Sequence, residues 1–289
     1  MQLVILAAVS SAVGLAWAVV VRALPQADPA RTASRRIGAR LADRPDVQRF
    51  LRARLDPQAA TGLALTLALA GVVATGIVFG VFVAMIRTNS GVVHADLAIT
   101  SWAAQNGTPF SWEVLGWVTE GGSTIVVVMV ALATAVYAMR RWKHRTALLF
   151  FLLVVGGQFL LSNLVKIAVE RVRPDVSPLE VLPGPSFPSG HATAAAATWA
   201  AVALVLGRGR SPRTRAVLGG IGAAIAVAVA GTRVFLGAHW TSDALGGLAL
   251  GWTWFGICAV AFGGRVLRLG APAKDAVAST PARARSSAA

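Results

Sequence analysis

Residues 146–165 read TALLFFLLVVGGQFLLSNLV, a run of 20 residues without one charged side chain. A bilayer-spanning helix needs about 20 such residues. All 27 basic and 12 acidic residues of the 289-residue chain also lie outside six further apolar stretches. These stretches are 2–21, 60–86, 121–139, 191–207, 216–232 and 244–263. The sequence therefore predicts an all-α, polytopic membrane protein, a bundle of seven helices.

Composition agrees with this class and argues against a soluble enzyme. Hydrophobic residues make up 56% of the chain and charged residues only 13%, whereas soluble domains carry about 25% charged residues. The single cysteine, Cys258, lies in an apolar stretch, so no intrachain disulfide can form. Residues 2–21 lack the basic leading segment of a secretory signal, and we expect a retained helix.

The number of basic residues in the connections between the apolar stretches alternates between high and low along the chain, which predicts an orientation. Connections 22–59, 140–145, 208–215 and 264–289 hold 22 lysines and arginines, and the other three hold five. The positive-inside rule places the basic-rich connections in the cytoplasm, and the N-terminus is then extracytoplasmic. The net charge of +15 is thus explained by the membrane surface, and we expect no nucleic-acid partner.

The domain organisation follows from the same pattern. Residues 1–23 are predicted as an N-terminal transmembrane helix, 24–59 as a basic cytoplasmic linker and 60–263 as a six-helix core. Residues 264–289, rich in alanine, serine, proline and arginine, predict a basic, disordered cytoplasmic tail. Between 91 and 120, apolar spacing and tryptophans predict interfacial helices on the outer leaflet.

The first of three polar clusters on the poorly basic side follows residues 146–165. Lys166 and Arg173 are seven residues apart, which places them on one face of a continuing helix, two turns apart. Pro174 disfavours helical geometry at Arg173 and predicts that the helix ends there. Taken alone, the pair is either an anion-binding site or two basic side chains that reach toward the membrane interface.

The second cluster is Pro188-Ser189-Gly190-His191, at the start of an alanine-rich helix. Ser189 can cap this helix, and Gly190 lets an anion approach the exposed backbone N–H groups and the helix dipole. The imidazole of His191 is suited to proton exchange near neutral pH. The alternative is a histidine that merely lies at the interface.

The third cluster runs from Thr232-Arg233 to His239 and Asp243. The four-residue spacing of His239 and Asp243 allows a carboxylate to hold one imidazole nitrogen and leave the other as a nucleophile or base. The alternative is that Asp243 favours the start of a helix by its charge and that His239 lies at headgroup level.

Together the clusters resemble the three-part signature of the type-2 phosphatidic acid phosphatase superfamily, which also includes bacterial polyprenyl pyrophosphate phosphatases and the vanadium haloperoxidases. The family pattern of Lys, six residues, Arg-Pro is similar to residues 166–174, and Pro-Ser-Gly-His is similar to 188–191. The pattern of Ser-Arg, five residues, His, three residues, Asp is similar to 232–243, with Thr232 in place of the serine. The resemblance implies that 60–263 is a six-helix phosphatase core with one extra N-terminal helix.

The resemblance also implies a mechanism. His239 is expected to form a phosphohistidine, Asp243 to orient it, and His191 to protonate the leaving oxygen. The phosphoryl oxygens are expected to be bound by Lys166, Arg173, Ser189, Gly190 and Arg233. Three cations can offset the charge of a terminal phosphate, about −1.5 to −2, so we expect no metal site and no cofactor.

The substrate class follows from the position of the clusters. A site at the outer ends of membrane helices suits a lipid whose tail stays in the bilayer, and polyprenyl diphosphate is the first substrate that the resemblance suggests. Phosphatidic acid and phosphatidylglycerol phosphate are the alternatives, as is a lipid phosphotransferase. An anion transporter would be a different class, but the apolar stretches carry no charged side chains. We expect a bacterial plasma membrane protein with an extracytoplasmic site, and the sequence leaves its oligomeric state open.

Overall fold

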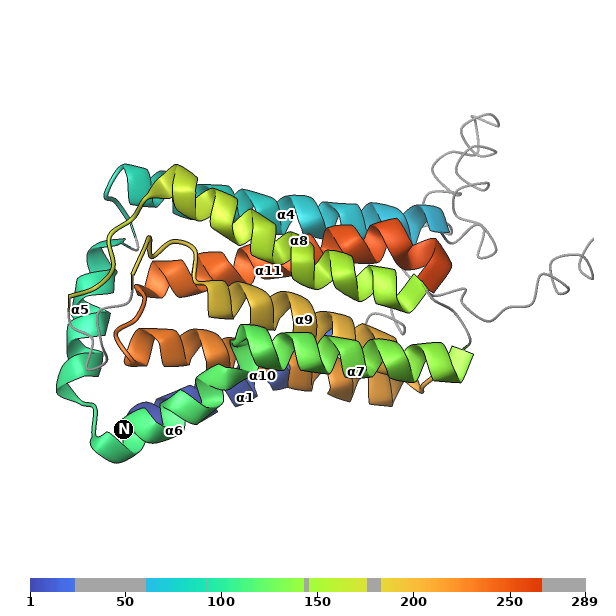
Figure 1. Ribbon diagram of the computed structural model, residues 1–289, viewed down its shortest axis with the longest axis horizontal. Helices are drawn as coiled ribbons and strands as arrows, with labels where there is room; N and C mark the ends of the chain where they lie inside the picture. Colours follow the sequence, from blue (N-terminus) through green and yellow to red (C-terminus); the bar gives the residue numbers. More distant parts are fainter. Residues whose placement is uncertain (24–60, 92, 143–145, 176–182, 267–289) are drawn as a thin grey trace, which may run out of the picture.

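The computed structural model describes residues 1–23, 61–91, 93–142, 146–175 and 183–266. Within these ranges every regular element is a helix (Figure 1). The long helices are α1 (Gln2–Ala23), α4 (Thr61–Arg87), α7 (Thr124–Trp142), α8 (Thr146–Val169), α9 (Gly190–Leu206), α10 (Pro212–Phe235) and α11 (Thr241–Val266). Each matches a predicted stretch to within four residues at either end. The prediction of an all-α membrane bundle is confirmed.

Length and apolar composition qualify four helices in the described part of the chain to cross a membrane. They are α7, α8, α10 and the Gln2–Val19 part of α1. Helix α9 and the Val72–Arg87 part of α4 are apolar but shorter. The predicted linker 24–59 and all of the predicted tail beyond residue 266 lie outside the described residues.

Two shorter helices occupy the region where the sequence predicts interfacial ones. Helix α5 (Val93–Gln105) crosses one end of the bundle, and α6 (Pro109–Thr119) leads from it into a 3₁₀ turn, η2 (Glu120–Gly122), before α7 (Figure 1). A capping box starts α6, because Thr108 and Ser111 each accept the other's backbone N–H at its hydroxyl. The N-terminus of α1 lies at this same end of the molecule (Figure 1).

Helix α9 lies at the centre of the bundle. It packs against α10, α11, α8 and α7, and one run along it is buried on nearly every side because its side chains are small: Ala192, Thr193, Ala194, Ala195, Ala196, Ala197 and Thr198. Small residues allow neighbouring backbones to approach closely, which is the main source of packing energy between helices in lipid. The central helix thereby holds its own start, where the second polar cluster lies, in one place.

Helix α1 packs along α10 through a pair of glycines. A Cβ atom added at Gly14 would lie 2.8 Å from the carbonyl oxygen of Gly220, and one added at Gly220 would lie 2.5 Å from the carbonyl oxygen of Gly14. Leu6 joins Leu115 of α6 and Leu236 in a small core farther along. Helix α1 is therefore packed closely against α10.

This contact predicts the effect of one added methyl group. Gly14→Ala should lower the midpoint of thermal unfolding in detergent by several degrees, because overpacking costs about 1–3 kcal/mol. The matched control is Gly80→Ala on α4, where an added Cβ meets nothing within 4 Å. We expect the control to unfold at or slightly above the wild-type temperature because alanine favours helix. Equal midpoints for the two variants would contradict the close contact.

Candidate active site

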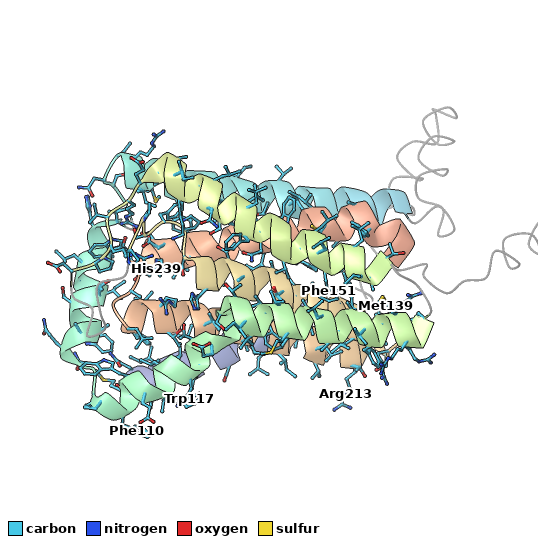
Figure 2. The ribbon with its side chains drawn as sticks, viewed as in Figure 1. Phe110, Trp117, Met139, Phe151, Arg213 and His239 are labelled. Carbon is cyan, nitrogen blue, oxygen red and sulfur yellow. The ribbon has the colours of Figure 1, made fainter. Side chains whose placement is uncertain are left out.

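The three predicted clusters meet at the end of the bundle that α5 crosses. Figure 2 labels His239 at this end, and Phe110 and Trp117 of α6 lie at the same end. The residues come from the end of α8 and the chain that follows it, the start of α9, the end of α10, and the turn between α10 and α11. Helix packing thus brings together segments that are up to 77 residues apart in sequence, from Lys166 to Asp243.

The structure corrects the prediction for the first cluster. Helix α8 ends at Val169, four residues before Arg173, and Glu170 adopts a left-handed φ of 50°. The chain then continues without helix, and the Ser186 backbone N–H donates to the carbonyl of Arg171 at 2.7 Å. The Ser186 hydroxyl also donates to Val172 O at 3.1 Å. This pairing with the later loop replaces the helical bonds, so Lys166 and Arg173 do not share one helix face.

Lys166 and Arg173 are nevertheless brought together by one loop. The Lys166 Nζ donates to the carbonyl of Pro185 at 2.7 Å, and Arg173 Nη2 reaches the same carbonyl at 3.4 Å. Arg173 Nε donates to Gly184 O at 3.0 Å, and its Nη1 donates to Ala238 O at 2.8 Å. Backbone carbonyls therefore hold both cations, which keeps their charges available to an anion.

Arg233 supplies a third cation from the last turn of α10. It is buried, its Nη1 donates to Thr119 Oγ1 at 3.3 Å, and its Nε has no hydrogen-bond partner among the described residues. A buried N–H without a partner costs free energy, about 1–3 kcal/mol, unless a ligand accepts from it. Arg233 is thus able to bind an anion without breaking an existing bond at Nε. The neighbouring Thr232 turns its hydroxyl to the carbonyl of Val229 on its own helix.

His239 and Asp243 face one another, as their spacing predicts. His239 Nδ1 lies 3.5 Å from Asp243 Oδ2, longer than an ordinary hydrogen bond, and both side chains are buried. On its other side, His239 Nε2 lies 3.3 Å from Arg173 Nη1. The imidazole therefore has a carboxylate behind Nδ1 and a cation in front of Nε2.

Ser189 and Gly190 begin α9 beside this pair. Ser189 holds the N-cap position, but its buried hydroxyl makes no capping bond and has no partner among the described residues, which differs from the predicted capping role. Its backbone N–H donates to Asp243 O at 3.1 Å and so ties the start of α9 to the start of α11. Nothing lies within 4 Å of a Cβ built on Gly190, so there is open space beside the first turn of the helix.

His191 follows directly and is half-buried. Its carbonyl oxygen lies so close to η2 that a Cβ on Gly122 would be 2.5 Å from it, which fixes the position of the helix start. The charges of Arg233, Lys166 and Arg173 act on its imidazole. The structure thereby brings together all eight residues that the sequence analysis selected.

Burial sets the ionisation of the nucleophile candidate. Removal from water lowers the pKa of His239 to about 4, the charges of Arg233 and Arg173 act in the same direction, and Asp243 opposes them. Burial likewise lowers the pKa of Arg173 from its ordinary value, with Asp243 again opposing, yet an arginine stays charged in proteins. A neutral imidazole beside a cation is the form that can attack an electrophilic phosphorus.

Two charged residues that the sequence analysis left without a role adjoin the site. Arg171 contacts Asp243, and Asp96 of α5 contacts Arg171. Asp96 is the one acidic residue of α5, which was a usable signal in the sequence. The pairing itself could not be read, because the two residues are 75 positions apart.

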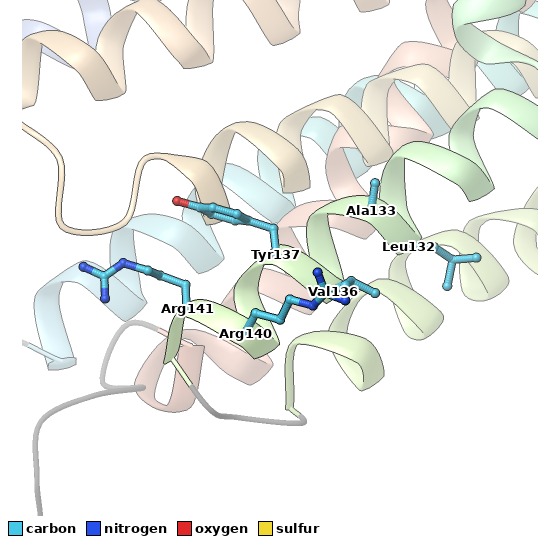
Figure 3. Close-up of a pocket in the computed structure, with 6 residues that line it drawn as sticks. All are labelled: Leu132, Ala133, Val136, Tyr137, Arg140 and Arg141. Carbon is cyan, nitrogen blue, oxygen red and sulfur yellow. The ribbon is translucent and has the colours of Figure 1, made fainter.

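A shallow surface depression lies away from these residues. It lies on the outer face of α7 and includes none of the candidate site residues (Figure 3). Its lining consists of Leu132, Ala133, Val136, Tyr137, Arg140 and Arg141. No cluster of three or more histidine, cysteine or acidic side chains suited to a metal ion occurs in the described ranges.

Cations gathered around a neutral, buried imidazole suit a phosphate, and an apolar bundle suits a substrate held in a bilayer; these properties define the class of integral-membrane lipid phosphatases. Comparison with known proteins then identifies the family. The chain belongs to the PAP2 superfamily, whose sequence pattern matches residues 147–266. It is a multi-pass membrane lipid phosphatase, a metal-independent hydrolase of phosphoric monoesters.

Two kinds of relative support this assignment. The chain is 34% identical to phosphatidylglycerophosphatase B of Bacillus subtilis over 181 residues, which are 60% of this chain and 85% of that one. It is 40% identical to a lipid A 1-phosphatase of Rhizobium johnstonii over 121 residues, 38% of this chain and 45% of the relative. The crystal structure of a transmembrane PAP2-type phosphatidylglycerolphosphate phosphatase from Bacillus subtilis superposes with a TM-score of 0.60 at 33% identity, covering 65% of this chain and 93% of that one.

The low pKa of His239 predicts a pH profile. Because the neutral imidazole of His239 is the reactive form, the acid limb of kcat/KM that this group causes should appear only as the pH approaches about 4, whereas loss of the His191 proton lowers kcat/KM on the alkaline side. The measurement is kcat/KM of the detergent-solubilised protein, calculated on the dianionic lipid phosphate because the second pKa of that group is about 6. An acid limb near the ordinary histidine value of about 6.5 would contradict the role of burial.

Proposed function

We propose that this chain removes the terminal phosphate of a membrane lipid at the extracytoplasmic face through a phosphohistidine on His239. One observation carries the proposal: a buried, neutral His239 lies between the carboxylate of Asp243 at 3.5 Å and the guanidinium of Arg173 at 3.3 Å. A nucleophile with an orienting acid on one side and an oxyanion-binding cation on the other is the arrangement that phosphoryl transfer requires.

The chemistry takes two steps. In the first, His239 Nε2 attacks phosphorus, the bond from phosphorus to the lipid oxygen breaks, and His191 gives its proton to that oxygen. In the second, His191 takes a proton from water as the water oxygen attacks phosphorus, and the bond from phosphorus to Nε2 breaks. The products are the lipid alcohol and orthophosphate, and the enzyme regains its initial protonation. Asp243 stabilises the positive charge of the phosphorylated imidazole.

The binding groups are matched to phosphate by their unused donors. Ser189 Oγ and Arg233 Nε are buried without partners among the described residues, and each gains a bond when a phosphoryl oxygen arrives. Lys166 and Arg173 add charge from the opposite loop, where backbone carbonyls hold them. Open space beside Gly190 leaves its N–H accessible to the same oxygens.

The relatives favour phosphatidylglycerol phosphate as the first substrate to test. Phosphatidylglycerophosphatase B is the relative of which this chain covers 85%, whereas it covers less than half of the lipid A 1-phosphatase. This order differs from the resemblance alone, which placed polyprenyl diphosphate first. Phe110 and Trp117 are exposed at the same end as His239 (Figure 2) and are suited to the headgroup level of a bilayer.

Substitution of the two histidines tests the reaction. His239→Ala and His191→Ala should each lower phosphate release at least about 1,000-fold, because each removes a group that takes part in bond making. The measurement is orthophosphate release from phosphatidylglycerol phosphate, polyprenyl diphosphate and phosphatidic acid, with EDTA present. Glu113→Gln, an exposed site on α6, is the matched control and should keep full activity.

Each alternative gives a distinct result in this assay. Trapped, acid-labile phosphate on wild type but not on His239→Ala supports the covalent step. Transfer of the phosphate to an added lipid alcohol would indicate a phosphotransferase. Folded wild-type protein that releases no phosphate from any of the three lipids would overturn the proposal and favour anion transport.

The orientation has its own test. The N-terminus and His239 lie at one end of the bundle. The basic-rich connection 208–215 joins α9 to α10 at the opposite end. In a Cys258→Ser background, Gln105→Cys on α5 should react with a membrane-impermeant maleimide on intact bacterial cells, and Arg210→Cys should not. Labelling of Arg210→Cys alone would place the site in the cytoplasm and contradict the positive-inside assignment.

A further inference from the structure

A buried chain of charges lies behind the catalytic pair. Arg171 Nη1 donates to Asp243 Oδ1 at 2.6 Å, and Arg171 Nη2 donates to Asp96 Oδ2 at 2.8 Å. The side chains of Asp96 and Asp243 are 2% and 0% exposed, and that of Arg171 is 11% exposed. One guanidinium therefore joins two carboxylates in a nearly dry environment, where such contacts are strong and a missing partner is costly.

The contacts leave Asp243 a single orientation. Arg171 occupies Oδ1, while the backbone N–H of Trp240 donates to Oδ2 at 3.0 Å. The guanidinium also lies over the Trp240 ring, 5.5 Å from its centre. With Oδ1 engaged in this way, Oδ2 is the oxygen that faces His239 Nδ1.

Asp96 fixes the same region from α5. Its Oδ1 accepts the backbone N–H of Ser242 at 2.9 Å, and its Oδ2 accepts the Ser242 hydroxyl. Arg171 Nη1 donates to that hydroxyl oxygen as well, at 2.6 Å. The crossing helix is thus bound to the first turn of α11, the turn that carries Asp243.

We infer that Asp96 and Arg171 are positioning residues, which set the rotation and the effective charge of Asp243 and through it the reactivity of His239. This inference rests on the proposed phosphatase function. The two residues have different parts. Arg171 holds the carboxylate in place, and Asp96 offsets the positive charge of Arg171, which would otherwise weaken the attraction between Asp243 and a phosphorylated, positively charged His239.

The charges around His239 give the two parts different signatures. His239 is faced by Asp243 from α11, Arg233 from α10, Arg173 from the chain after α8 and the titratable His191 from α9. Loss of Arg171 leaves two buried carboxylates on this side, which favours the protonated imidazole and moves the acid limb of kcat/KM to higher pH. Loss of Asp96 leaves Arg171 unbalanced, which disfavours the protonated imidazole and moves the limb the other way.

The experiment compares Asp96→Asn, Arg171→Gln and the double variant with wild type on phosphatidylglycerol phosphate. We expect each single variant to lose about 10- to 100-fold in kcat with KM changed by less than about threefold, because a misplaced orienting group affects chemistry more than binding. The double variant, which removes both charges together, should lose no more kcat than the less active of the two single variants. Arg171→Lys should recover part of the loss, since it keeps the charge but not the two-sided contact.

Controls separate this inference from the function on which it rests. Glu113→Gln and Arg87→Gln change exposed charges outside the site and should behave as wild type. An inactive wild type would refute the phosphatase proposal itself. Active wild type with an inactive His239→Ala, but with unchanged kcat and pH profile in all Asp96 and Arg171 variants, would overturn the positioning role alone. Where both single variants fold, additive losses in the double variant would likewise overturn the positioning role. If a single variant does not fold, the charge-balanced double variant decides, and an unchanged kcat or a rise in KM alone would overturn that role.

Discussion

The carboxylate of Asp243 is the group around which the active end of the bundle is arranged. It is wholly buried in an apolar molecule, where an unpaired charge would not be tolerated, and its partners come from separate parts of the chain. Arg171 contacts one oxygen, the Trp240 backbone the other, and the Asp243 carbonyl accepts the N–H of Ser189. Satisfying this one residue therefore fixes the end of α8, the start of α9 and the start of α11 relative to one another.

The site combines groups that are fully satisfied with groups that are not. The Asp243 carboxylate is held by internal bonds from Arg171 and the Trp240 backbone, whereas Ser189 Oγ, Arg233 Nε and His239 Nδ1 are buried without a hydrogen-bond partner among the described residues. In the proposed reaction, the first set holds the geometry before substrate arrives, and the second gains its bonds only with a phosphoryl group present. Such a division provides preorganised electrostatic stabilisation, which is the largest contribution that a protein makes to phosphoryl transfer.

Close packing by small residues supplies the rigid frame for these contacts. The alanines of α9 bring four neighbouring helices against it, and the glycine pair of α1 and α10 brings the N-terminal helix into the same bundle. At its start, α1 also reaches the crossing helices: Gln2 Nε2 donates to Ala103 O of α5 at 2.6 Å and its Oε1 accepts the Ser111 hydroxyl of α6 at 3.1 Å. Helix α5 carries Asp96, so the extra helix supports the site from a distance.

The sequence by itself determined the helices and their order, because freedom from charge over about 20 residues has one stable outcome in a bilayer. It also selected the candidate site residues, since the spacing within each cluster is local information. It could not give the end of α8, which pairing between Arg171 and Ser186 sets, nor the Asp96–Arg171–Asp243 chain, whose members are up to 147 residues apart. Those features were decided only by the tertiary structure, because buried charges take whichever partners the packed helices bring within reach.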